Sequence, residues 1–473
     1  MKKLIENTYT LLADSLTPVS IYLKVRDLFP NPLLLESNDF HYLENCFSYI
    51  CLDPVAEFRV KDKKLFLKHT GEPEQTKTLK REELHGYLKN FIQHIKSSPG
   101  NEMNGFFGYM TYDSVKYFEN IEIKTSSSDQ DIPDIRYQFF RYVIAINHFK
   151  NQVTIKENRL PEEESQLADL ISVIRNKPVP QYPFKASLAE QSNMTDDYYT
   201  SLVDKAKSHC QRGDVFQLVL SRSFSRNFKG DEFNVYRALR SINPSPYLFY
   251  FDYGDYKLIG SSPEMQLKTK DQTAVLNPIA GTFKRTGEDV EDKKLAEKLL
   301  KDEKENSEHV MLVDLARNDL ARNTNEVEVA RYKEVQFYSH VLHIVSSVTG
   351  KMKSPGDVLK ILSDTFPAGT LTGAPKYRAM QLIDQYEPDK RGFYGGCIGF
   401  INPAGESNHA IMIRTLLSKG NNLYYQAGAG IINESVKENE MKEVDHKLAA
   451  IRNAIERAVN IHSKFTSYEN ISS

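Results

Sequence analysis

The sequence predicts an α+β protein in which short strands and amphipathic helices are mixed along the chain. In the first part, runs rich in β-branched and aromatic residues are typical of strands, and apolar residues at helical spacing are typical of helices. The strand-like runs are 55–60, 64–68, 105–111 and 138–146, and the helical stretches are 81–96 and 162–174. The 473 residues suggest about two to three domains, or one large domain with an N-terminal addition.

A change of composition near residues 176–197 predicts a domain boundary. Three prolines are followed by the polar run 190–197, and such clusters are typical of connections rather than of packed elements. We therefore divide the chain into an N-terminal region, residues 1–180, and a second domain, residues 190–465.

The second domain opens with a predicted helix and a predicted strand. Thr195 is a suitable N-cap, apolar residues then recur at helical spacing, and Gly213 is suited to end the helix. Residues 215–224 alternate between two faces, as in a β-strand. Gln217 lies within this apolar strand, where a buried amide requires hydrogen-bond partners.

A later segment places two carboxylates at the start of an apolar helix. Residues 306–320 are apolar almost all round at helical spacing, which predicts a buried helix. Glu305 and Glu308 lie at its start, one turn apart. They either need a cation or hydrogen bonds to offset desolvation, or only stabilise the helix dipole.

The last predicted helix carries charged residues beside an apolar stripe over 441–455. Glu440, Glu443 and Lys447 occupy the adjacent arc, where they either line a cleft or form a solvated face with an i,i+4 pair. Two carboxylate clusters without His or Cys companions suit a hard cation, so we predict Mg²⁺. His343, in an apolar run, is either a proton-transfer group or a core histidine.

Glycine-rich turns crowd into the last quarter of the chain. Glycine lets a backbone approach a ligand closely, so the density of these turns favours a ligand site over simple hairpins. Residues 369–376 lack the GxxxxGK[ST] order, and no GxGxxG opens a helix after a strand. Nucleoside triphosphates and dinucleotides are therefore disfavoured.

Composition and charge disfavour several other classes of protein. The 61 basic and 63 acidic residues nearly cancel, so nucleic acid is not an expected partner. The N-terminus lacks a signal-peptide pattern and no window approaches about 18 apolar residues, so we expect no membrane span and a cytoplasmic location. The four cysteines form no CxxC pair, which argues against disulfides and zinc.

Several motifs in a fixed order carry a family resemblance. They are 213–222, Gly-Ser-Ser-Pro-Glu at 260–264, Pro-Ile-Ala-Gly-Thr at 278–282, 308–322, 369–376 and Gln-Ala-Gly-Ala-Gly at 426–430. Through them the chain resembles the anthranilate synthase component I family of chorismate-utilising enzymes. The resemblance implies a large sandwich of two stacked antiparallel sheets flanked by helices. It also implies that chorismate and ammonia are converted to 2-amino-2-deoxyisochorismate and then to anthranilate and pyruvate, the first step of tryptophan biosynthesis.

The resemblance assigns roles to individual residues. Glu264 matches the general acid, and His343 matches the histidine linked to pyruvate elimination. The residues that match substrate contacts are Thr370, Tyr394, Arg414, Gly428, Gly430 and Lys447. The residues that match Mg²⁺ ligands are Glu308 and Glu443, with Glu305 and Glu440 assisting.

Two positions separate the activities within the family. Gln217 stands where isochorismate and salicylate synthases carry a lysine base for water, which favours ammonia instead. Ala280 stands where aminodeoxychorismate synthases carry a nucleophilic lysine, and alanine cannot attack. The remaining alternative is a non-catalytic relative that only binds chorismate or tryptophan, and a leaving-group acid at Glu264 weighs against it. Thr286 departs from the family, which has glycine there.

The resemblance also implies regulation and a partner. The residues that match a tryptophan feedback site are Glu36, Ser37, Pro244, Ser245, Pro246 and Tyr247. No segment resembles the Cys-His-Glu motifs of an amidotransferase. A separate glutamine amidotransferase subunit, component II, is therefore implied as the source of ammonia.

Overall fold

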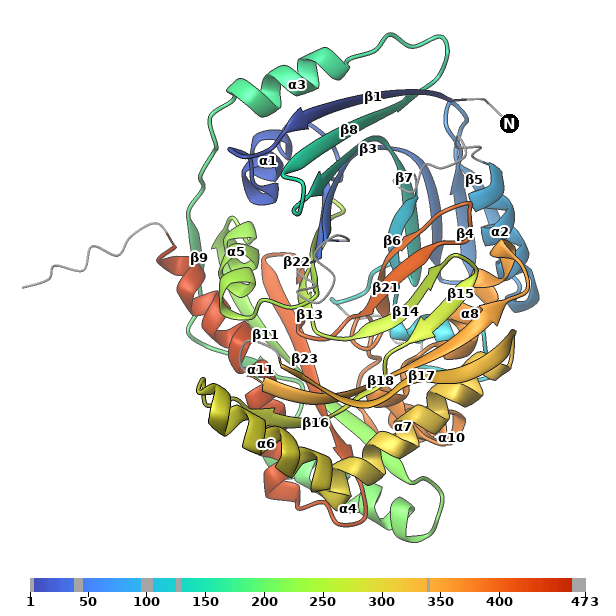
Figure 1. Cartoon of the computed structure of the whole chain (residues 1–473), viewed down its shortest axis with the longest axis vertical. Helices are drawn as coiled ribbons and strands as arrows, with labels where there is room; N and C mark the ends of the chain where they lie inside the picture. Colours follow the sequence, from blue (N-terminus) through green and yellow to red (C-terminus); the bar gives the residue numbers. More distant parts are fainter. Residues whose placement is uncertain (1–3, 38–45, 95–104, 125–128, 338–340, 462–473) are drawn as a thin grey trace, which may run out of the picture.

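The strands join into one hydrogen-bonded network in which the described pairings are antiparallel (Figure 1). The long strands β3 (Phe47–Lys61) and β7 (Ile135–Asn147) pair at its centre, and two arms of strands diverge from them. This mixture of helices and antiparallel strands confirms the predicted α+β class. The computed structural model describes residues 4–37, 46–94, 105–124, 129–337 and 341–461.

The first arm runs from β3 to β11. In order of pairing its strands are β2 (Leu33–Ser37), β12 (Tyr247–Asp252), β13 (Tyr256–Ser262), β22 (Thr415–Lys419), β23 (Asn422–Ile431) and β11 (Gln217–Gly230). The short strands that pair with β11 are β9 (Phe184–Ala186), β10 (Gln191–Ser192) and β19 (Gly373–Ala374).

The second arm runs from β7 to β18. In order of pairing its strands are β6 (Phe106–Met110), β20 (Cys397–Ile401), β21 (Ser407–Ile411), β14 (Met265–Lys270), β15 (Thr273–Leu276) and β18 (Val341–Met352), which also pairs with β16 (Ile279–Lys284) and β17 (Thr324–Phe337). The peripheral strands beside β3 and β7 are β4 (Lys64–Lys68), β5 (Gln75–Thr78), β8 (Gln152–Arg159) and β1 (Ile5–Leu12).

Side chains from both arms meet in one buried apolar cluster, so the arms stack as two layers of a sandwich. Phe249 of the first arm shares this inner cluster with Phe107 and Ile398 of the second. The neighbours of Phe249 on β12, Leu248 and Tyr250, belong to a different cluster on the outer face. Because successive side chains of a strand point to opposite faces, a strand covered on both sides is apolar throughout. The two-sheet sandwich implied by the family resemblance is confirmed.

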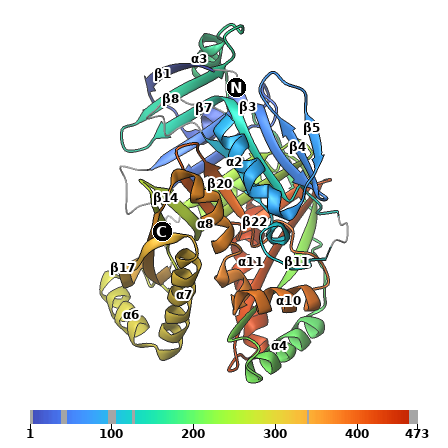
Figure 2. The same ribbon diagram turned by 90° about the vertical axis from the view of Figure 1, so that its right-hand side faces the viewer.

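Helices cover the outer face of each layer, and Figure 2 shows α6 and α7 apart from α4, α10 and α11 at the lower end. The helices packed on the first arm and its neighbours are α1 (Pro18–Val25), α3 (Leu167–Asn176), α4 (Asp196–Gln211), α5 (Phe233–Ile242), α10 (Lys376–Tyr386) and α11 (Lys437–Val459). Those on the second arm are α2 (Leu84–His94), α7 (Glu303–Ala321) and α8 (Val358–Thr365), while α6 (Asp289–Lys301) covers β16 and β18. The short elements are η2 (Arg81–Glu83), η3 (Tyr112–Tyr117), η4 (Pro355–Asp357) and α9 (Gly369–Thr372).

Local sequence signals predicted several elements well. The Thr195 hydroxyl caps α4 by accepting from the Tyr198 amide at 3.2 Å, and Gly213 follows the helix with a φ of 79°. The predicted apolar stripe of α11 is buried against the first arm. These predictions are confirmed because caps and stripes depend on neighbouring residues alone.

Two helix predictions need correction. The prediction that 306–320 is buried all round is wrong, because α7 buries one face and leaves Val310 40% exposed. Its charged residues Asp314 and Arg317 occupy the outer face, where they pair with each other at 3.1 Å. The helix predicted over 162–174 begins at Leu167, because Glu163 instead accepts from the Leu160 amide in a turn.

The N-terminal region and the second domain share sheet strands. β2 pairs with β12, and β6 pairs with β20, so both arms contain strands from each side of residue 180. Within the described ranges, no helix has the length and apolar character that a bilayer crossing requires.

Candidate active site

Two adjacent chain crossings between the layers form the centre of the candidate active site; we call this point the seam. β13 leads through Glu264 into β14, and β21 leads through Arg414 into β22. The Ser261 amide donates to the Arg414 carbonyl at 3.2 Å, and the Ile411 amide donates to the Glu264 carbonyl at 3.0 Å. The backbones that carry an acid and a guanidinium are therefore held side by side.

Glu264 is a carboxyl group suited to donate a proton. The Thr370 hydroxyl, on α9, donates to its Oε1 at 2.8 Å. Burial raises the pKa of Glu264 from its ordinary value of 4.5 to about 7, although the Thr370 hydrogen bond and the charge of Lys447 act in the opposite direction. Near neutral pH, this carboxyl group is therefore protonated in a large fraction of the protein molecules.

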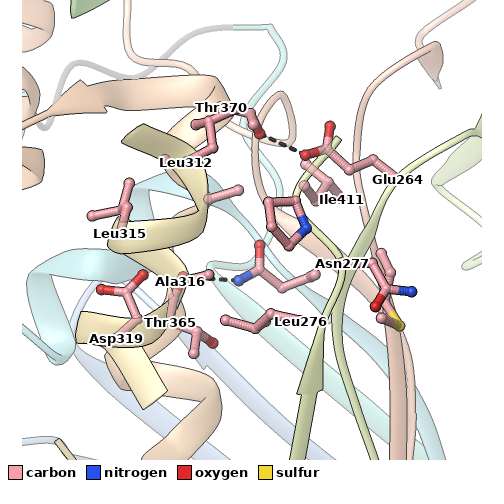
Figure 3. A pocket seen from close by; sticks show the side chains of 15 residues that line it. Glu264, Leu276, Asn277, Leu312, Leu315, Ala316, Asp319, Thr365, Thr370 and Ile411 are labelled. Atoms are coloured by element: carbon pink, nitrogen blue, oxygen red, sulfur yellow. Dashed lines mark hydrogen bonds between the residues drawn. The ribbon is translucent and has the colours of Figure 1, made fainter. Parts of the chain in front are cut away.

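A pocket lies against Glu264 and follows α7 (Figure 3). Glu264 and Thr370 lie at one end of this pocket and Asp319 lies at the other, with Leu312 on the wall between them. Lys376 neutralises Asp319 through an ion pair of 2.7 Å. The apolar wall beside Glu264 supplies the desolvation that disfavours its charged form.

Arg414 is a partly enclosed cation without a partner among the described residues. Desolvation lowers the pKa of Arg414, and its guanidinium makes no hydrogen bond or ion pair to another described residue that would offset this cost. Its backbone has a φ of 51°, a left-handed conformation that non-glycine residues adopt at a cost. Tyr394 lies close enough to stabilise the Arg414 charge, and the Gly428 backbone contacts the Tyr394 hydroxyl. A guanidinium in this position is suited to bind a carboxylate.

Gln217 links β11 to the carboxylates of α7. Its Nε2 donates to Glu308 Oε1 at 3.1 Å, so the buried amide has a polar partner. A Cβ at Gly430, on the paired strand β23, would lie 2.6 Å from this Nε2. Glycine is therefore required at position 430 if the Gln217 side chain is to reach α7.

Glutamates from α7 and α11 lie close enough to repel one another. Burial and the charge of Glu308 raise the pKa of Glu305, and Glu443 adds to this effect. Burial also raises the pKa of Glu440, where Glu443 again contributes and a Ser435 hydrogen bond opposes the shift. Each of the four carboxylates that the family resemblance assigns to a metal therefore interacts electrostatically with at least one of the others.

This donor set suits Mg²⁺ chemically, since it is made of carboxylate oxygens with unbalanced negative charge. Over the ranges that the structure describes, no three His, Cys, Asp or Glu side chains converge as a ready metal cage. Mg²⁺ is commonly held by only one or two carboxylates together with waters and substrate oxygens, so the residues present fit this ion. Lys447 partly balances the cluster through Glu443 at 2.7 Å and also donates to the Gly428 carbonyl at 2.8 Å.

His343 lies on β18, opposite a bulge in β16. Its Nδ1 donates to the Gly281 carbonyl at 2.9 Å, which leaves Nε2 as the acceptor of the neutral ring. Burial lowers the pKa of His343, and the charge of Arg414 acts in the same direction. Ala280 is buried in the same bulge. The neutral imidazole is therefore the favoured form and is suited to accept a proton.

The residues assigned to tryptophan binding gather at a second location. β2 and β12 pair so that Ser37 lies opposite Tyr247. Glu36 is buried and accepts from Arg240 at 2.8 and 2.9 Å. The remaining residues of this set, Pro244, Ser245 and Pro246, precede β12 directly.

A hydrogen-bonded link joins this second location to the seam. The Asn243 amide group donates to the hydroxyls of Ser245 and Ser261, each at 3.3 Å. Ser261 is also the residue whose backbone amide holds the Arg414 carbonyl.

The structure adds two charged residues that the sequence analysis missed. Glu387 and Arg391 are buried, with exposed fractions of 3% and 2%, and they form an ion pair. Their segment reads Glu-Pro-Asp-Lys-Arg-Gly, a composition typical of an exposed turn. Their i,i+4 spacing was the one available signal, and it does not distinguish a solvated pair from a buried one.

Comparisons with known proteins identify relatives over almost the whole chain. The family model described as chorismate binding enzyme matches residues 34–453. Anthranilate synthase component 1 of Aquifex aeolicus is 36% identical over 480 residues, which cover 97% of this chain and 97% of that protein. The protein of the same name from Thermus thermophilus is 36% identical over 95% of this chain and 97% of its own length.

Solved structures agree with these relatives. The crystal structure of anthranilate synthase component I from Streptococcus pneumoniae has a TM-score of 0.74 at 34% identity, and the match covers 86% of this chain and 92% of that chain. The menaquinone-specific isochorismate synthase of Escherichia coli has a TM-score of 0.73 at 19% identity, over 96% and 95% of the two chains. The second similarity concerns the fold alone.

We expect Glu264→Gln to remove a pH-dependent loss of stability. The folded-state pKa of Glu264 is raised from 4.5 to about 7, so the wild-type free energy of unfolding falls as the pH rises through this window. Glutamine does not ionise, and the variant therefore gains up to about 3 kcal/mol relative to wild type between pH 5 and pH 8. Urea unfolding at both pH values measures this gain, with Glu297→Gln on the exposed side of α6 as the control. A difference that is the same at both pH values would contradict the prediction.

Proposed function

The chain belongs to the chorismate-binding enzyme family, and from this premise we propose that it aminates chorismate with ammonia and then eliminates pyruvate to form anthranilate. It is an enzyme, a lyase of the anthranilate synthase type. The observation that carries the detailed proposal is the seam, which holds a protonatable acid, Glu264, and a guanidinium, Arg414, that has no partner among the described residues.

The seam matches the two polar demands of chorismate. The ring hydroxyl of chorismate is a poor leaving group unless an acid protonates it, and desolvation raises the pKa of Glu264 to about 7, so that about half of the molecules carry this proton at neutral pH. Its enolpyruvyl carboxylate requires a cation, and Arg414 with Tyr394 offers one at a desolvated position. Glycine at positions 428 and 430 keeps β23 close to β11, because a Cβ there would lie 2.6 Å from the Leu220 carbonyl oxygen and 2.6 Å from Gln217 Nε2, respectively.

Amination forms one bond and breaks another. The nitrogen of ammonia attacks the ring carbon next to the carboxylate-bearing carbon, the ring double bonds shift, and the hydroxyl leaves as water with a proton from Glu264. The new C–NH3⁺ group then loses a proton, which replaces the one that Glu264 gave up. In the second step, the proton on the aminated carbon is removed, the enolpyruvyl C–O bond breaks and the ring becomes aromatic. The neutral Nε2 of His343 is suited to accept the proton in this second step, and the enolate that leaves takes up a proton at its methylene carbon to become pyruvate.

Two side chains support ammonia as the nucleophile. Gln217 supplies an amide where a water-activating base would require a basic side chain, and its Nε2 is held by Glu308. Ala280 carries no nucleophile and lies buried in the β16 bulge. Both features oppose the isochorismate and aminodeoxychorismate alternatives.

We assign Mg²⁺ to the glutamates of α7 and α11, with Glu308 and Glu443 as the main ligands and Glu305 and Glu440 assisting. When bound, this ion would neutralise the carboxylate cluster and polarise the ring carboxylate of the substrate. Thr370 and Lys447 complete the proposed substrate contacts, because both lie against groups that define the site.

We also propose that the enzyme acts in the cytoplasm with a glutamine amidotransferase subunit and is inhibited by tryptophan. The partner follows from the need for ammonia and from the component 1 names of the relatives. The proposed inhibitor site is the pairing of β2 with β12, and the Asn243 and Ser261 hydrogen bonds connect it to the seam.

The direct test supplies the purified chain with chorismate, Mg²⁺ and excess ammonium at alkaline pH. We expect anthranilate and pyruvate by mass spectrometry, and we expect both products to disappear on chelation. Glu264→Gln should lower the rate by at least about 100-fold, because general acid catalysis is lost, while Glu297→Gln should leave it unchanged. Isochorismate or aminodeoxychorismate as the product would reject the proposal.

His343→Ala should separate the two steps. We expect the amino intermediate to accumulate and anthranilate formation to fall about 100-fold, as is typical when a general base is removed. Quenched time courses analysed by liquid chromatography measure both species. Unchanged anthranilate output would remove His343 from the elimination step.

Ser37→Ala should weaken inhibition by tryptophan. The loss of one hydrogen bond of about 1 kcal/mol corresponds to a roughly fivefold higher half-inhibitory concentration. Inhibition curves at fixed chorismate measure this change, with the exposed Ser201→Ala on α4 as the matched control. Superimposable curves for Ser37→Ala and wild type would argue against this location for the inhibitor.

A further inference from the structure

A buried ion pair lies behind the proposed substrate site. The Arg391 guanidinium donates to Glu387 through Nε at 2.9 Å and through one terminal nitrogen at 2.6 Å. Both side chains are almost completely buried, and neither lines the pocket beside Glu264. A buried pair is costly to desolvate and contributes little net stability unless its remaining polar atoms are also satisfied.

The remaining polar atoms of this pair bind the backbone of the substrate site. Glu387 Oε1 accepts from the amide and the hydroxyl of Ser221, both at 2.8 Å. Arg391 donates to the Val219 carbonyl at 2.8 Å and to the Leu371 carbonyl at 2.5 Å. The pair therefore joins β11 to the end of α9.

These contact points adjoin the proposed substrate residues. Ser221 and Val219 of β11 lie opposite Gly428 and Gly430 of β23, respectively. The Ser221 hydroxyl also accepts a hydrogen bond from the Gln426 side chain of β23 at 2.8 Å. Leu371 directly follows Thr370, which bonds Glu264. The ion pair thus holds β11 and α9 directly, and it holds β23 through Ser221.

The same pair determines which guanidinium is available next to Tyr394. The Arg391 guanidinium lies 5.6 Å from the centre of the Tyr394 ring, and the charge of Arg414 also acts on this tyrosine. Glu387 neutralises Arg391, whereas no described residue neutralises Arg414. Of these two guanidiniums near Tyr394, Arg414 is therefore the one that no described residue neutralises and that an incoming carboxylate can bind.

We propose that Glu387 and Arg391 are positioning residues for the substrate, an inference that rests on the proposed function. They hold the backbone at Gly428, Gly430 and Thr370 in register, and they direct the enolpyruvyl carboxylate to Arg414. Neither residue touches the substrate. Groups outside the substrate contacts affect function in this way because a displacement of about 1 Å at a site can lower activity by as much as 100-fold.

The test compares Glu387→Gln with a matched pair elsewhere in the fold. Arg26 and Asp231 form a similar bidentate pair, at 3.0 and 2.6 Å, beyond the opposite end of β11 from Gln217. Thermal unfolding and steady-state kinetics with ammonium are measured for Glu387→Gln and Asp231→Asn. We expect both variants to lose thermal stability, and we expect the KM for chorismate to rise about 10- to 100-fold in Glu387→Gln alone, with a smaller change in kcat.

A second variant avoids leaving a buried charge unpaired. Ser221→Ala keeps the ion pair but removes the hydroxyl that joins Glu387 to Gln426, and we expect a KM several-fold above wild type with near-wild-type thermal stability. Arg391→Lys keeps the positive charge but lacks the several N–H donors of the guanidinium. Its KM for chorismate should therefore rise above wild type, but less than that of Arg391→Gln, which also loses the charge.

The outcomes separate this inference from the proposed function. An unchanged KM in folded Glu387→Gln or in Ser221→Ala would overturn the positioning role, as would an equal rise in Asp231→Asn. A wild-type chain that makes no anthranilate from chorismate and ammonium would instead reject the proposed function itself.

Discussion

The site depends on the seam, the point where two neighbouring strand connections cross between the sheet layers. Backbone hydrogen bonds from Ser261 to Arg414 and from Ile411 to Glu264 tie these crossings together. Strands on either side are buried on both faces, so the crossing residues cannot shift without disturbing two apolar cores. An acid and a guanidinium are therefore presented from rigid strand ends rather than from a loose loop.

Four charged residues in and behind the site form two pairs with different roles. The charges of Glu387 and Arg391 balance each other, and both side chains also form hydrogen bonds that hold the backbone of β11 in place. Glu264 and Arg414 lack a charged hydrogen-bonded partner among the described residues, and desolvation shifts the pKa of each towards its neutral form. The site therefore holds a protonated carboxyl group and a guanidinium without charged partners, and a ligand that accepts the proton and carries a carboxylate stabilises both groups on binding.

Local patterns predicted the elements that local interactions determine. The Thr195 cap and the apolar stripe of α11 depend on residues within a few positions of each other, and both are present. The prediction for α7 failed because apolar content was weighed without the outer face, where Asp314 and Arg317 meet solvent. Periodicity shows which side of a helix is apolar, but it does not show how much of the helix a partner covers.

The sequence alone determined the fold class, several strand and helix positions, and the ordered motifs that mark the family. It also nominated Glu264, Arg414 and the glutamates of two separate helices as site residues. Tertiary structure decided which of them meet: Thr370 reaches Glu264 across 106 positions, and Gln217 reaches Glu308 across 91. It alone revealed the buried pair behind the site, because the burial of a charge depends on what packs against it, and packing between distant segments leaves no local pattern.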